Sequence, residues 1–123
     1  MITAKLEDEI IYIIIDGDFT YEDFLNAVNP IFKSGENYIG FISDGRKMTT
    51  MKPTLQHQLE QHHQKYNANK PNAILMNPND GKKILAKIYV RFTNAINTKI
   101  FTDEEEAVKW VKSFRPKAAT SAN

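Results

Sequence analysis

The stretch Ile10-Ile11-Tyr12-Ile13-Ile14-Ile15, followed at once by Asp16-Gly17-Asp18-Phe19-Thr20, decides the fold of this chain. Its first six residues are apolar and do not alternate with polar ones. Such a run predicts a strand that is covered on both faces, as in the interior of a parallel or mixed sheet. The Asp-Gly-Asp turn ends this strand and Thr20 begins a helix, which is the basic step of an α/β domain.

The rest of the chain continues the same alternation. Residues 2–6 alternate apolar and polar side chains, which predicts an edge strand, and the Asp8-Glu9 turn pairs it with the central strand as an antiparallel hairpin. Asn29-Pro30 is expected to kink or break the first helix, and Thr102 to Glu105 to form a capping box. The first helix is predicted from Thr20 to Gly35, and a strand over 38–43 follows it and leads into a polar turn at 44–46. A helix from Pro53 and a strand over 73–76 come next. The last elements predicted are a helix over 84–92, a strand over 99–101 and a final helix that Pro116 stops.

This order, β-β-α-β-α-β-α-β-α, predicts a single α/β domain with a mixed five-stranded sheet and four helices. The N-terminal hairpin is antiparallel and the other strands are parallel, joined by right-handed crossovers. The domain is expected to cover residues 1–114, and residues 115–123 are expected to form a flexible C-terminal tail.

Composition narrows the function only by exclusion. The chain has 123 residues, a net charge of +1 and no cysteine. A charge so close to zero gives no reason to expect nucleic acid as a partner, and thiolate metal sites and disulfides are excluded. The acidic N-terminus lacks the apolar segment of a secretory signal and no apolar run is long enough to span a bilayer, so a cytoplasmic location is expected.

Two stretches give the chain a resemblance to a known family. One is Gly17-Asp18-Phe19-Thr20-Tyr21-Glu22-Asp23-Phe24, where a strand runs into a Thr-capped helix. The other is the stretch 99–111, Lys-Ile-Phe-Thr-Asp-Glu-Glu-Glu-Ala-Val-Lys-Trp-Val, with a short strand before an acidic helix start. Together with the order of elements they resemble the STAS-like superfamily, and within it the SpoIIAA-like branch.

The resemblance implies a non-enzymatic regulatory module that binds a protein partner, a nucleotide or a lipid. In the antagonists of this family a serine in an Asp-Ser-Ser/Thr-Gly type motif is phosphorylated after the third strand. This sequence instead has Ser43-Asp44-Gly45-Arg46-Lys47-Met48-Thr49-Thr50-Met51, so the phosphorylation site does not carry over. Thr49 and Thr50 are the nearest hydroxyls to the expected helix start and are candidate phosphoacceptors; the alternative is that they are plain loop or capping residues.

An enzymatic alternative comes from Asp16-x-Asp18-x-Thr20 after the apolar strand. It matches the first motif of haloacid dehalogenase-like phosphatases, in which the first Asp attacks phosphorus, the second is the acid/base and Mg²⁺ lies nearby. The preceding hairpin, the short chain and the lack of a clear paired-acid motif downstream argue against this reading. In the competing interpretation, Asp16 and Asp18 shape a turn and Thr20 caps the helix.

Three further expectations concern sites. His57, His62 and His63 lack the i, i+4 spacing of a helical metal site, so no metal or cofactor is expected. His62 should be partly buried and the other two solvated.

If a ligand binds, the carboxyl ends of the parallel strands should form the rim of its site, because ligands of open α/β sheets bind there. The candidate rim residues are Asp16, Asp18, Ser43, Asp44, Asn77 and Asn79.

The helix predicted over 84–92 is more apolar than one sheet face requires. It is a candidate interaction surface for a protein partner, a lipid or a second copy of the chain, or else a helix buried on two sides. The residues that carry this surface are Ile84, Leu85, Ile88, Tyr89 and Phe92. From sequence we therefore expect a binding module for a protein partner or for a small apolar, lipid-like or anionic ligand.

Overall fold

The computed structural model of the protein describes residues 1–78 and 97–115. Within them lie five strands and three helices. The elements are β1 (Ile2–Glu7), β2 (Ile10–Gly17), α1 (Tyr21–Ser34), β3 (Gly40–Met48), α2 (Pro53–Asn67), β4 (Asn72–Leu75), β5 (Thr98–Phe101) and α4 (Glu104–Lys112).

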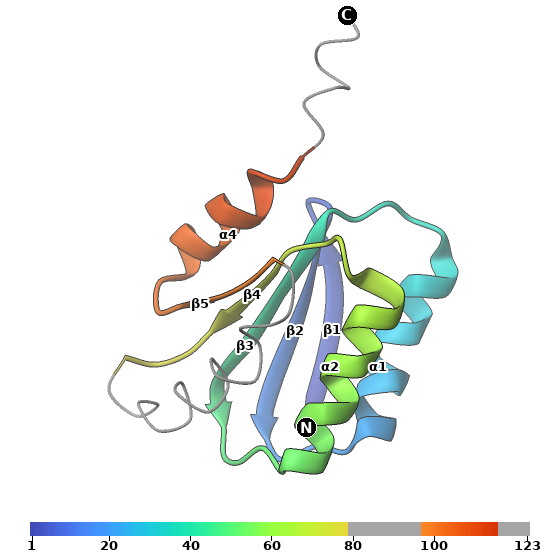
Figure 1. The fold of residues 1–123 in the computed structure, drawn as a ribbon, viewed down its shortest axis with the longest axis vertical. Helices are drawn as coiled ribbons and strands as arrows, with labels where there is room; N and C mark the ends of the chain where they lie inside the picture. Colours follow the sequence, from blue (N-terminus) through green and yellow to red (C-terminus); the bar gives the residue numbers. More distant parts are fainter. Residues whose placement is uncertain (79–96, 116–123) are drawn as a thin grey trace, which may run out of the picture.

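The five strands form one sheet in the order β1-β2-β3-β4-β5. β1 pairs antiparallel with β2, and every other pair is parallel. Figure 1 shows α1 and α2 together on one face of this sheet and α4 on the other. The predicted α/β domain and its mixed sheet are confirmed, whereas the fourth predicted helix, over 84–92, lies outside the described residues.

The inner strand β2, between β1 and β3, contributes side chains to both faces of the sheet. Ile11, Ile13 and Ile15 pack with α1 and α2, and Ile10 packs with α4 through Ala107. Alternate residues of β2 therefore pack into two separate cores, one on each face of the sheet. This explains why the run 10–15 contains apolar residues at successive positions. The prediction was wrong at one position: Ile14 is 37% exposed. In the described part of the chain, the residues that pack on the α4 face of the sheet do not cover the whole length of β2.

Helix α1 begins and ends as predicted. The Thr20 side chain accepts a hydrogen bond from the Asp23 backbone N–H (3.1 Å), and the Asp23 carboxylate accepts one from Thr20 N–H (3.0 Å). Gly35 closes the helix in the left-handed conformation, which favours glycine. Of the predicted kink or break at Pro30, the break does not occur, since the helix continues to Ser34. Pro30 is exposed, while apolar residues on both sides of it pack on the core, so burial outweighs the lost hydrogen bond.

Strand β3 differs most from expectation. It continues through Asp44-Gly45-Arg46, where a polar turn was predicted, and ends at Met48. Asp44 and Arg46 lie on one face and pair with each other at 2.7 Å. Gly45 faces the other way, where an added Cβ would be 2.8 Å from Met76 Sδ. These three residues therefore form part of a strand and not a turn, because each contacts a partner on one face of the sheet or the other.

The last helix also begins later than predicted. Its N-cap is Asp103, whose side chain accepts from Glu106 N–H at 3.2 Å, and not Thr102. The helix ends at Lys112, and Pro116, which was predicted to stop it, lies outside the described residues. Ala107 and Val111 are its buried residues. None of the helices in the described ranges combines the length and apolarity that a bilayer span requires.

Candidate functional site

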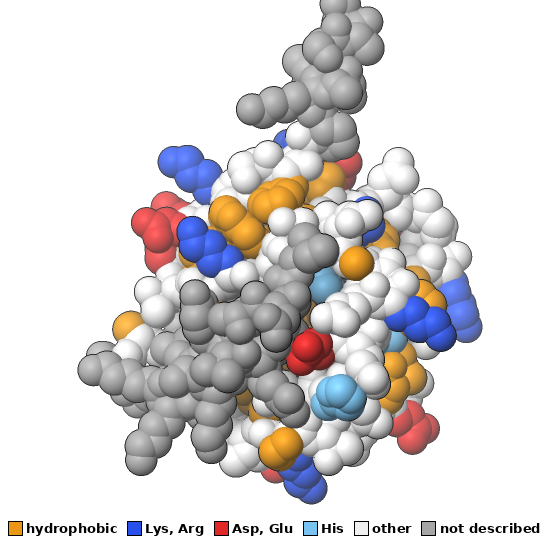
Figure 2. Space-filling model, viewed as in Figure 1, with side chains coloured by type: hydrophobic (Ala, Val, Ile, Leu, Met, Phe, Trp, Pro, Cys, Tyr) orange, Lys and Arg blue, Asp and Glu red, His pale blue; other side chains and the backbone are white. Residues whose placement is uncertain are grey.

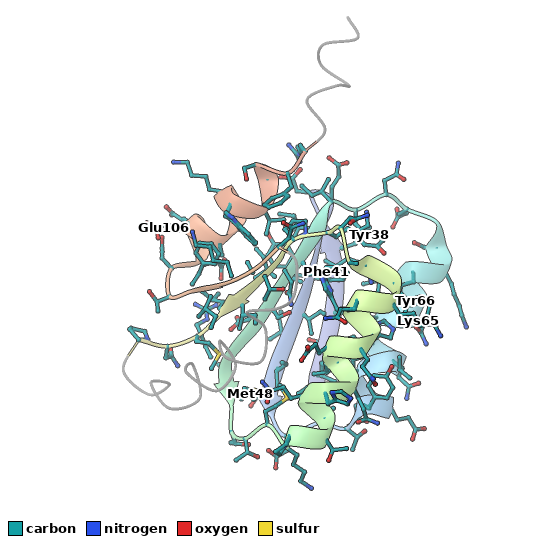
Figure 3. The ribbon with its side chains drawn as sticks, viewed as in Figure 1. Tyr38, Phe41, Met48, Lys65, Tyr66 and Glu106 are labelled. Carbon is teal, nitrogen blue, oxygen red and sulfur yellow. The ribbon has the colours of Figure 1, made fainter. Side chains whose placement is uncertain are left out.

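An apolar cavity of about 80 Å³ lies between the sheet and the two helices α1 and α2. β3 borders it over most of its length, from Phe41 near the start of the strand to Met48 at its end, and both side chains are labelled in Figure 3. The apolar residues that line it are Ile2, Ile13, Ile15, Phe19, Phe24, Phe32, Phe41, Met48, Met51, Leu59, Ile74 and Met76, with Gly45 among them.

The cavity exists because α2 stands away from the sheet. Among the described elements, the backbone of α2 packs more extensively against α1 than against any strand. Side chains therefore fill most of the space beneath α2, and Leu59 reaches into it from the helix. Gly45 contributes no side chain on the strand side, and the Met76 side chain approaches closely there, since an added Cβ would lie 2.8 Å from its Sδ.

Polar residues form a smaller part of the cavity wall, and Ser43, Asn67 and Asn72 among them are hydrogen-bonded. The Ser43 hydroxyl donates to Asn72 Oδ1 at 2.9 Å. The Tyr38 hydroxyl donates to Asn67 Oδ1 at 2.7 Å. Asn67 is only 4% exposed, and it is the last residue of α2. Buried polar groups are normally paired in this way. These three side chains add neutral polar groups to a wall that is otherwise mainly apolar.

Two neighbouring histidines of α2 also line the cavity. His63 Nε2 lies 3.2 Å from Lys70 O. A carbonyl oxygen can only accept, so Nε2 carries the hydrogen and Nδ1 is an acceptor in the neutral ring. Burial lowers the pKa of His63, although the bond to Lys70 opposes this shift. The expectation that His63 is solvated was wrong, because its ring packs edge-on against Phe41 with the centroids 5.5 Å apart.

His62 lies in an aromatic cluster between α1 and α2. Its ring meets Phe24 edge-on at 5.2 Å between centroids and lies 4.8 Å from Tyr66. It is 8% exposed, more buried than the boundary position expected. Burial, together with the charge of Lys65, lowers the pKa of His62. Both cavity histidines therefore favour the neutral form, whereas His57 is exposed as predicted.

Asp18 and the two candidate phosphoacceptors form a separate cluster where β2 and β3 end. Asp18 Oδ1 accepts hydrogen bonds from Thr49 Oγ1 at 2.6 Å and Thr50 Oγ1 at 3.0 Å. The hydrogen bonds from Thr49, first, and Thr50 lower the pKa of Asp18. All three side chains are exposed. The cluster holds the ends of two neighbouring strands together.

Three other predicted rim residues, Ser43, Asp44 and Asn77, bond to residues outside the Asp18 cluster. Ser43 and Asp44 are inside β3 and point to opposite faces of the sheet, because side chains alternate along a strand. Asp44 instead pairs with Arg46, which also reaches Glu104 of α4 at 3.0 Å. Burial opposes ionisation of Asp44, but the bonds from Arg46 outweigh it and lower its pKa. Asn77 Nδ2 donates to Arg46 O at 2.8 Å.

Part of the predicted site set falls on residues that the structure leaves out. Asn79 of the rim lies there, as do Ile84, Leu85, Ile88, Tyr89 and Phe92 of the apolar interaction helix. Within residues 1–78 and 97–115 no group of three His, Asp or Glu side chains could hold a metal ion. Asp18 is bound by two hydroxyls, so the described residues give the phosphatase alternative no support.

A surface cleft of about 500 Å³ lies at the C-terminal end of α2, beside the cavity. Tyr38, Lys65 and Tyr66 line it and lie at the same end of α2 in Figure 3. Lys70 also lines it; its Nζ donates to Tyr38 O at 3.0 Å and lies 4.6 Å from the centre of the Tyr38 ring. Asn67 lines both the cleft and the cavity.

Sequence reasoning missed both the cavity and the cleft. The cavity draws its wall from six described elements and from the loops between them, and no local pattern encodes such an arrangement. One signal was present: a glycine inside an apolar strand marks a place where something approaches closely or space is left. Gly45 has that role here, but it was assigned to a turn.

The comparisons with known proteins identify the fold. No protein-family model matches the sequence, and no curated protein is similar to it. A solved structure is similar, that of an uncharacterised protein of the DUF3478 family from Shewanella loihica PV-4, described as having a SpoIIAA-like fold. The two share 15% sequence identity with a TM-score of 0.60, over 90% of this chain and 92% of the other. The chain therefore has the SpoIIAA-like fold, as the resemblance implied.

Proposed function

We propose that this protein is a non-enzymatic, STAS-like binding module whose cavity beneath α2 holds a small apolar group. The observation that carries the proposal is the cavity itself, which is lined mainly by large aliphatic and aromatic side chains. Filling an apolar space removes ligand surface from water, at about 25 cal/mol per Å². A pocket of this kind with a few polar groups is the default binding-site hypothesis for a protein of this class.

The size of the cavity limits what it can hold. At about 80 Å³ it is smaller than an apolar cavity of about 150 Å³ that accepts benzene. It therefore suits the end of an alkyl or branched chain rather than a ring system or a whole lipid. A protein partner, a second copy of the chain, and phosphorylation of Thr49 or Thr50 stay predictions from sequence.

A series of linear alcohols tests the proposal. Butan-1-ol, hexan-1-ol and octan-1-ol are titrated into the protein while amide shifts are followed by NMR. Affinity should rise about fourfold for each added methylene, because each buried methylene contributes about 0.8 kcal/mol. The rise should stop once the cavity is full. Shifts should centre on the cavity side of β3, and those around Ala107 on the opposite face should stay small.

A matched pair of variants locates the binding site. Leu59→Trp places a larger side chain into the cavity from α2 and should abolish alcohol binding. Leu25→Trp makes the same change on α1, where the residue packs on the same core without lining the cavity, and should bind as the wild type does. Thermal unfolding verifies that both variants fold, since overpacking costs about 1–3 kcal/mol. Equal binding by both variants, or no binding by the wild type, contradicts the proposal.

A further inference from the structure

We propose that the surface cleft at the end of α2 binds the acidic head of a single-chain amphiphile whose apolar end occupies the cavity. This inference rests on the proposed function, since it adds a head-group site to the same ligand. The predicted ligand class is an amphipathic anion such as an alkyl carboxylate.

The first argument is the charge of the cleft. Its described lining includes Lys65 and Lys70 and no Asp or Glu, although the whole chain carries a net charge of only +1. The carbonyl end of α2 lies here as well, with a partial charge of about −0.5, which two ammonium groups outweigh. On the face that Figure 2 shows, basic and acidic side chains are otherwise interspersed around the described surface. The cleft is therefore a local cationic site.

The Lys70 side chain is already held in place. Its Nζ donates one hydrogen bond to Tyr38 O at 3.0 Å and lies over the Tyr38 ring. An ammonium group has three donors, so two hydrogens are left for a ligand oxygen. Holding the side chain in advance reduces the entropy that binding would otherwise cost.

The second argument is that the cleft and the cavity share a wall. Asn67, 4% exposed, lines both spaces and accepts the Tyr38 hydroxyl hydrogen at 2.7 Å. A second link runs from His63 in the cavity wall to the carbonyl of Lys70 in the cleft wall, at 3.2 Å. A chain that enters the cavity near Asn67 would thus carry its head group toward the two lysines.

The third argument is size. The cavity of about 80 Å³ takes only the end of a chain, while the cleft of about 500 Å³ can take the remaining atoms and a hydrated head group. Neither space alone suits a complete amphiphile, because small-molecule sites usually measure about 300–1,000 Å³ and enclose most of the ligand. The two spaces together meet both the apolar and the polar requirement.

The test compares octanoate with octan-1-ol, which share a tail and differ in head charge, by NMR titration of the full chain at low ionic strength. Octanoate should bind more tightly than the alcohol. In the double variant Lys65→Gln/Lys70→Gln octanoate should lose about twofold to twenty-five-fold in affinity, because each exposed charge pair contributes a factor of about 1.4 to 5. Binding of octan-1-ol should not change. Raising the salt concentration should weaken binding of octanoate alone.

Two controls separate the outcomes. Lys52→Gln removes a lysine at the other end of α2 and should leave octanoate binding intact. Acetate, the head without the tail, should bind far more weakly than octanoate. Equal affinity of wild type and double variant for octanoate, or competition by acetate at equal concentration, overturns the head-group site while leaving alcohol binding, and so the proposed function, standing. Failure of octan-1-ol itself to bind overturns both.

Discussion

At the scale of single residues, the acidic turn after β2 is explained by its hydrogen bonds. Asp18 accepts two threonine hydroxyls from the segment after β3, so its carboxylate ties two parallel strands together where they end. A phosphate on Thr49 would place a second anion beside this carboxylate and break the cross-link. Two of the three residues in the motif that resembles a phosphatase, Asp18 and Thr20, thus have structural partners.

This role predicts a change in the titration of Asp18. In Thr49→Val/Thr50→Val the carboxylate loses both hydroxyl donors, and its pKa should rise toward the ordinary value of 3.8. A carboxyl with a depressed pKa stabilises the fold above its unfolded pKa and loses that contribution as the pH falls through the folded value. The variant should therefore lose less stability between pH 4 and pH 2. Side-chain carboxyl NMR titration measures the pKa directly, and an unchanged value contradicts the cross-link.

His62 gives a second pH prediction with its own sign. Its pKa is lowered in the folded protein, mainly by burial and further by Lys65, from an ordinary value of 6.5. The unfolded chain therefore binds more protons just below that value, and stability falls as the pH drops below 6.5. His62→Phe keeps an aromatic ring against Phe24 and should reduce this dependence, while His63, whose pKa burial also lowers, keeps its own share. Urea unfolding at pH 7.5 and 5.5 tests it, with His57→Phe, an exposed position, as control.

The hydrogen bonds that individual side chains make could be predicted only in part from the sequence. Thr20 and Asp23 are close in sequence, so their reciprocal bonds follow from the local pattern. Asp18 and Thr49 are 31 positions apart, and their contact depends on the register between β2 and β3, which contains a shift between Ile14 and Asp16. The sequence placed the threonines near a helix start and could not place them beside an aspartate.

At the scale of elements, strand and helix identity followed from periodicity, whereas their ends did not. The run 10–15 was identified as an inner strand because burial on two faces leaves an unbroken apolar pattern. The pattern predicts a strand that ends at Ser43, because Asp44-Gly45-Arg46 has the residue types of a turn. In the fold, the Asp44–Arg46 pair and the close approach of Met76 to Gly45 satisfy those residues within a strand. Tertiary partners outweighed local preference, as they commonly do in strands.

The start of α4 offers a direct test of an element boundary. Asp103→Ala removes the N-cap acceptor for Glu106 N–H and should lower the free energy of unfolding by about 1 kcal/mol. Thr102→Ala alters the residue that the sequence pattern favoured and should change stability by less than about 0.5 kcal/mol. Chemical denaturation compares the two. An equal loss in both, or a larger loss in Thr102→Ala, contradicts the assignment of Asp103 as N-cap.

At the scale of the whole molecule, the two faces of the sheet are packed differently. On the α4 face, the buried residues Ala107 and Val111 pack with Ile42 and Leu75, whereas the face beneath α2 retains a cavity. The cavity could not be predicted, since it depends on how far a helix stands from a sheet. The proposed binding function therefore rests on a feature of the assembled fold.

The same asymmetry predicts an order of local opening. α2 lies over the cavity, packs mainly on α1 and has no side-chain hydrogen bond at its N-cap, Lys52. Elements with fewer buried contacts open at lower free energy than the core. Amides of α2 should therefore exchange with solvent at least about tenfold faster than those of β2 and β3. Saturating octan-1-ol should slow the exchange of α2, because the ligand fills the space beneath the helix.

Native-state hydrogen exchange by NMR measures both effects. The variant Leu59→Trp, which fills the cavity itself, should remove the response to alcohol. If α2 exchanged as slowly as β2, or if alcohol protected α4 instead, the assignment of α2 as the loosely packed wall of the binding site would be wrong.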